Sequence, residues 1–83
     1  MLWMITTFEA FKQRHPTLEG CNNTYLLQIY GPEGVVIQSL EHQGLSPEAC
    51  VPEIRTHFDE DSPLAKIEVF DERGLLRVYR QRP

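Results

Sequence analysis

Several features of other protein classes are missing from this sequence of 83 residues. No stretch approaches the roughly 18 apolar residues of a membrane span. Only two cysteines are present, Cys21 and Cys50, which is too few for the disulfide framework of a small secreted domain. Basic residues number 8 against 12 acidic ones, for a net charge of −4, so the chain lacks the basic excess typical of nucleic-acid binders. A small globular domain remains.

Motifs that carry catalysis or bind metals are also missing. The three histidines form no H-x-x-x-H or H-E-x-x-H pattern, and the cysteines lie 29 residues apart, which is not a zinc spacing. His57 precedes an acidic stretch, but the alternating acids and the glycine of a calcium loop are absent. Cys50 stands near a helix start, where a small buried cysteine is the usual outcome. We therefore expect no enzyme activity, no metal and no cofactor.

The residues that are present predict two helices and four strands. Thr6 and Glu9 have the spacing of a capping box at the start of a first helix, which His15 and Pro16 end. Ser46 and Pro47 begin a second helix, in which Pro52 either produces a kink or separates a short first turn. The expected segments are helices at 6–15 and 46–58 and strands at 25–30, 35–40, 64–70 and 75–80.

These segments give the order α-β-β-α-β-β in a single domain of residues 1–83, with 1–4 as a flexible arm. Turn and cap signals recur 40 residues apart, which indicates a tandem αββ repeat with halves at about 5–41 and 45–81. The expected fold is α+β, a two-layer sandwich in which two helices cover one face of a four-stranded antiparallel sheet. Together with Lys66 to Asp71 and Gly74, this order resembles that of small tandem modules such as PepSY-like domains. The resemblance implies a topology and no functional residue.

Alternation of side chains along the strands predicts two unlike faces. Tight hairpins would pair Ile29 with Val36 and Glu68 with Arg77. One face is then nearly all apolar and forms the core under both helices. The opposite face is mixed, has no cover from the helices, and carries Tyr30, Phe70, Leu75, Arg77 and Tyr79.

Exposed aromatic, aliphatic and arginine side chains on one face are typical of protein interfaces. We therefore expect a regulatory or adaptor module that binds another protein, or a second copy of itself as a homodimer, through those five residues. Two alternatives stay open: single-stranded nucleic acid stacking on the aromatic face, which the charge disfavours, and an acidic surface at 48–72 that mimics nucleic acid. Met1 to Ile5 lacks the basic start of a secretory signal, so we expect a cytoplasmic protein and no membrane contact.

Overall fold

The computed structural model describes residues 5–16, 21–60 and 63–81, and confirms an α+β fold with a four-stranded antiparallel sheet and two helices. The expected arm at 1–4 lies outside the described residues. The elements are α1 (Phe8–Arg14), β1 (Asn23–Tyr30), β2 (Val36–Gly44), the short 3-10 helix η1 (Pro47–Cys50), α2 (Val51–Glu60), β3 (Lys66–Asp71) and β4 (Gly74–Arg80).

The sheet has the order β2-β1-β3-β4, so the first strand of each hairpin is central and the second is an edge strand. Leu27 pairs with Val69, and Ile29 pairs with Ile67. Positions 67 and 69 lie 40 residues after positions 27 and 29. Each of these two β1 residues therefore pairs with the counterpart of the other, so the pairing of the two central strands is symmetric and agrees with the 40-residue relation expected from the sequence. The helices do not keep it, and the tandem αββ repeat is not confirmed.

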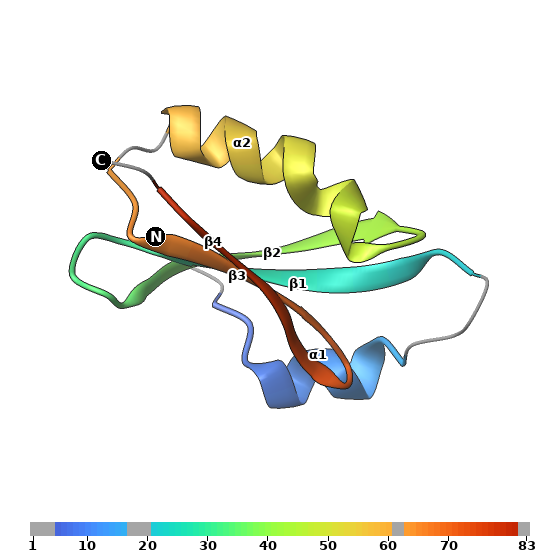
Figure 1. The fold of residues 1–83 in the computed structure, drawn as a ribbon. Coiled ribbons are helices and arrows are strands. Elements are labelled where there is room, and N and C mark those ends of the chain that lie inside the picture. Colours follow the sequence, from blue (N-terminus) through green and yellow to red (C-terminus); the bar gives the residue numbers. More distant parts are fainter. Residues whose placement is uncertain (1–4, 17–20, 61–62, 82–83) are drawn as a thin grey trace.

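The two helices lie on opposite faces of the sheet, which corrects the expectation that both cover the same face (Figure 1). The side that carries α2 holds the main core, made of Tyr25, Leu27, Ile29, Cys50, Ile54, Leu64, Ile67 and Val69. The other side, which was expected to be open, carries α1. Phe8 stacks on Phe70 there with ring centroids 5.5 Å apart, and Phe11 is 0% exposed. Because this face is itself partly apolar, covering it with α1 removes hydrophobic surface from water.

The α2 layer begins with η1 because Pro52 lacks the N–H that would continue a regular helix through this segment. Pro52 therefore separates a short first turn from α2, one of the two outcomes expected for it. Ser46 is the residue before η1 but makes no side-chain cap bond. At the other end of α2, the Gln81 side chain accepts a bond from the Leu64 N–H at 2.7 Å and donates to the Phe58 carbonyl at 3.2 Å.

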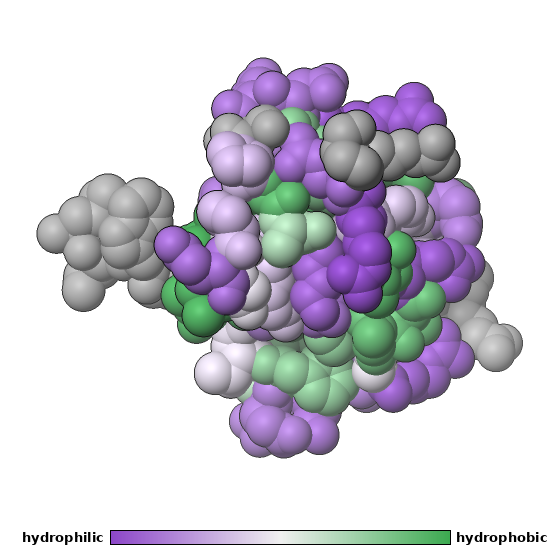
Figure 2. Space-filling model, turned by 60° about the vertical axis from the view of Figure 1, so that its left-hand side comes forward, coloured by the Kyte–Doolittle hydropathy of each residue, from purple (hydrophilic) through white to green (hydrophobic). Residues whose placement is uncertain are grey.

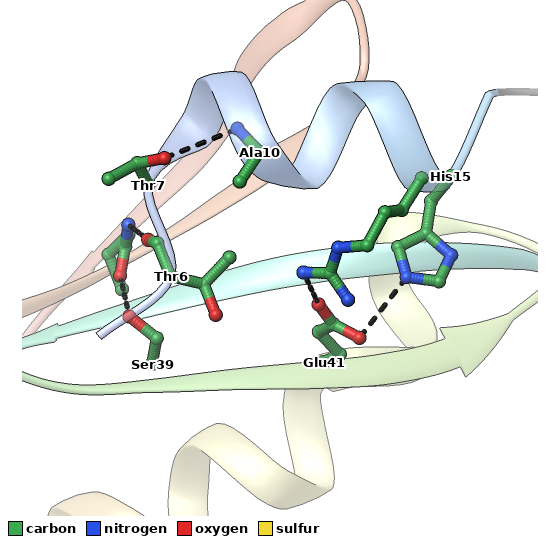
Figure 3. A network of polar contacts seen from close by, with 8 residues as sticks. Thr6, Thr7, Ala10, His15, Ser39 and Glu41 are labelled. Atoms are coloured by element: carbon green, nitrogen blue, oxygen red, sulfur yellow. Dashed lines mark hydrogen bonds and ion pairs between the residues drawn. The ribbon is translucent and has the colours of Figure 1, made fainter. Parts of the chain in front are cut away.

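Polar contacts attach α1 to β1 and β2 (Figure 3). Thr7, and not Thr6, caps the helix, because the Thr7 hydroxyl accepts the Ala10 N–H at 3.2 Å. The Thr6 carbonyl instead accepts a bond from Gln28 at 2.8 Å, and the Ser39 hydroxyl donates to the same Gln28 side chain.

At the other end of α1, Glu41 of β2 holds two basic side chains. The Arg14 guanidinium donates to Glu41 at 2.7 Å, and the His15 ring lies 3.2 Å from the second carboxylate oxygen. The helix is thus fixed to the sheet at both ends.

Candidate functional site

The structure separates the five predicted anchor residues onto the two faces of the sheet. Phe70 pairs with Leu75 as expected, but an irregularity then shifts the register so that Val69 pairs with Arg77 and Ile67 with Tyr79. Residues directly opposite each other share a face. Arg77 and Tyr79 therefore lie on the α2 side, whereas Tyr30, Phe70 and Leu75 lie on the α1 side.

This bulge gives Arg77 and Tyr79 partners of their own. Arg77 donates to the Glu48 carboxylate at 2.9 Å in place of the expected pair with Glu68, and this bond holds the pKa of Glu48 below its usual range. Tyr79 packs against the core under α2, together with Leu76. The expected pairing of these residues was wrong because one extra residue in a strand reverses the side of every residue after it.

The first hairpin also departs from the expected register, but with a different consequence. Leu27 pairs with Leu40 and Ile29 with Gln38, so β2 is shifted by two residues from the expected pairing. A shift by two residues leaves each side chain on the face expected for it, so Leu27 and Leu40 still face the core. This hairpin also has an irregularity, between Ile29 and Tyr30, 40 residues before the one between Val69 and Phe70.

Part of the α1 side remains outside the cover of α1. Tyr30, Lys66 and Arg80 lie side by side across β1, β3 and β4, and the next row contains Glu68 opposite Val78. We call these five residues the open strip. Val78 is 40% exposed, and Leu75 beside Phe70 is 51% exposed. Val78 belongs to this strip because of the bulge.

Tyr30, Glu68 and Lys66 form a connected polar group within the open strip. The Tyr30 hydroxyl donates to Glu68 Oε1 at 2.7 Å, and Lys66 Nζ lies 3.1 Å from Glu68 Oε2. The same ammonium group lies 4.6 Å from the centre of the Tyr30 ring. Burial, followed by the bond to Glu68 and its negative charge, raises the pKa of Tyr30 to about 12.

This pKa leads to a prediction for alkaline pH. Because folding raises the pKa of Tyr30 from 10.0 to about 12, the neutral phenol stabilises the fold fully below pH 10.0, and this contribution is lost as pH rises through 12. In a spectrophotometric titration of the native protein, Tyr30→Phe is expected to remove a phenol that ionises near pH 12. Loss of a phenol that ionises near pH 10 instead would contradict the contact with Glu68.

Of the residues considered for chemistry, Cys50 lies in the core, and His42 and His57 lie beside Glu53. Cys50 is fully buried, and burial, followed by the charges of Glu48 and Glu53, raises the pKa of its thiol to about 11. Such a thiol is the opposite of an activated nucleophile. Glu53 lies 3.2 Å from His57 and 4.0 Å from His42. Within residues 5–16, 21–60 and 63–81, no group of three or more histidine, cysteine or acidic side chains could hold a metal ion.

Sequence reasoning missed Val78 and Arg80 as members of this surface. The signal that would have placed them is the bulge in β4, and no residue type marks it, since Leu75, Leu76 and Arg77 all suit a regular strand. No helix in the described part of the chain is long and apolar enough to cross a bilayer. No family model, curated protein or solved structure matches the chain, so the resemblance to PepSY-like modules gains no support.

Proposed function

We propose that this protein is a small non-enzymatic module, regulatory or adaptor in kind, that binds another protein through the open strip and the adjoining Leu75. The supporting observation is that Leu75 and Val78 are 51% and 40% exposed on an edge strand, beside charged and aromatic side chains. Apolar residues in such a setting are typical of interfaces. A second copy of the chain is one form that this partner can take.

The arrangement of hydrophobic surface favours a partner with mixed chemistry. Seen with the end that carries the β1–β2 turn brought forward, hydrophobic side chains alternate with hydrophilic ones and form no single broad patch (Figure 2). A partner that covers such a surface needs charged groups as well as apolar ones. We also propose a cytoplasmic location, which the free thiols of Cys21 and Cys50 favour.

Single-stranded nucleic acid is a weaker proposal, because the aromatic side chains lack a common stacking platform. Lys66 lies over the Tyr30 ring, Phe70 stacks with Phe8, and Tyr79 packs on the core under α2. Base stacking needs free ring faces on one surface.

Nucleic-acid mimicry is also weaker. Glu48, Glu53 and Asp71 are engaged with Arg77, His57 and Arg73, respectively. These ion pairs reduce the negative electrostatic field of the acidic residues at 48–72.

Site-specific photocrosslinking in the native cells tests the proposed surface. A benzophenone amino acid at Val78 is expected to give discrete protein adducts, whereas the same group at Leu45 is not. Leu45 is a matched control, because it is apolar and 73% exposed but lies between β2 and η1. Adducts to another protein or to a second copy support the proposal. Equal adducts from both positions, nucleic-acid adducts only, or none from Val78 would overturn it.

A further inference from the structure

The outer edge of β4 is a second feature of the proposed surface. In the described part of the chain, β4 pairs with β3 on one side and with no strand on the other. Alternate residues of an edge strand direct their N–H and C=O groups away from the sheet, where another strand can pair with them. Proline often blocks such an edge, but Gly74–Arg80 contains none.

The other edge strand, β2, contacts α1 and η1. Glu41 of β2 is held on one face by Arg14 of α1 and by His15, which follows α1. Near the end of β2, a Cβ on Gly44 would lie 2.3 Å from the Cβ of Ala49 in η1, which shows how closely η1 packs there. Both edge strands carry exposed apolar side chains, Ile37 on β2 and Leu75 and Val78 on β4, so it is the charge of β4 that favours it as the edge that receives a partner.

The charge of this edge restricts what can pair with it. Residues 73–83 contain four arginines and no acidic residue, in a chain whose net charge is −4. Within β4, Arg77 is already bonded to Glu48. Arg80 is exposed, and its side chain makes no hydrogen bond or ion pair with the residues at 5–16, 21–60 and 63–81. The β4 strand of a second copy contains no acidic residue that could lie opposite Arg80, so pairing two β4 strands would leave this charge without a partner.

We propose that β4 receives an extended acidic segment of another protein, which adds a fifth strand to the sheet. This inference rests on the proposed function and specifies its partner. Residues opposite each other in neighbouring strands share a face. The added strand therefore has an aspartate or glutamate opposite Arg80 and, two residues away on the same face, a branched apolar residue opposite Val78. Backbone hydrogen bonds to β4 would supply the affinity for the segment, and the side chains opposite Arg80 and Val78 would supply the specificity.

A defined peptide tests strand addition directly. The probe is an eight-residue peptide, Glu-Thr-Val-Thr-Glu-Thr-Val-Thr, which carries glutamate and valine alternately on one face. In an NMR titration with the full chain, the amide signals of β4 are expected to shift, and those of β2 are not. A peptide with lysine in place of glutamate is expected to bind at least about tenfold more weakly. Equal binding of the lysine peptide would overturn the charge argument.

Backbone methylation separates strand addition from simple side-chain docking. N-methylation of every second residue blocks one edge of the peptide and leaves the other edge intact. One methylated series is expected to lose binding and the other to keep it, because a strand pairs with β4 through one of its edges. If both series bind equally, the peptide does not add as a strand.

Charge reversal on the protein provides the matched control. Arg80→Glu is expected to weaken the binding of the glutamate peptide by about tenfold. Arg55→Glu is expected to keep the affinity within about twofold of that of the unsubstituted protein. Arg55 is an exposed residue of α2, so both variants change the net charge equally. Equal weakening by both would overturn the assignment to β4. If the peptide fails while Val78 still crosslinks to a protein, strand addition is wrong and the proposed function stands.

Discussion

Replacing Phe11 by alanine is expected to lower the free energy of unfolding by about 3–5 kcal/mol. Phe11 is 0% exposed on the helix that covers the second face of the sheet, so its removal leaves a cavity between α1 and the strands. A domain of this size is expected to have only about 5–10 kcal/mol of stability. The loss can be measured by urea denaturation followed by circular dichroism.

Two further variants make the Phe11 result interpretable. Gln13→Ala, at an exposed position of the same helix, is expected to change stability by less than about 0.5 kcal/mol. Phe11→Leu keeps most of the buried volume and retains a measurable folded state if the alanine variant does not fold. A loss below about 1 kcal/mol for Phe11→Ala would show that α1 does not belong to the cooperative unit.

Gly44→Ala is expected to destabilise the protein by about 1–3 kcal/mol through overpacking. A Cβ at this position would lie 2.3 Å from the Cβ of Ala49, which is far closer than carbon atoms approach without a bond. Since Gly44 ends β2 and Ala49 lies in η1, the added methyl group forces the η1 layer away from the sheet. Thermal denaturation of the variant measures the loss.

A compensating substitution tests the cause. Ala49→Gly removes the atom that the new methyl group meets, so the double variant is expected to be less destabilised than the sum of the two single changes. The difference is expected to be at least about 1 kcal/mol. Simple additivity would mean that another cause, such as the conformational preference of Gly44, accounts for the loss.

The sequence was sufficient to predict most of the local structure. Proline and glycine positions gave the turns, and Pro52 separated η1 from α2. Alternation along the strands predicted one apolar core face, and Leu27, Ile29, Ile67 and Val69 form that face in the structure. These predictions succeeded because each depends on neighbouring residues and on a strand period of two.

The residues of the predicted site do not lie on one surface, because the face on which each residue lies depended on features beyond its own segment. The bulge after Val69 moved Arg77 and Tyr79 to the α2 side and exposed Val78. As a result, a double substitution of Tyr30 and Tyr79 would remove core packing as well as surface contact, and Val78 is the sharper probe. Contact with a partner stays a prediction for each of the five residues, Tyr30, Phe70, Leu75, Arg77 and Tyr79.

The amino-acid sequence by itself determined the order of elements, the antiparallel hairpins and the apolar face under α2, because these follow from local preferences and side-chain periodicity. Only the tertiary structure decided which face receives α1 and how β4 is registered on β3. Phe8 and Phe11 suit either face, and the choice is made by Phe70, Gln28 and Glu41, which lie on three different strands of the sheet. The face that α1 covers depends on contacts between residues more than 20 positions apart, which no pattern within a single segment records.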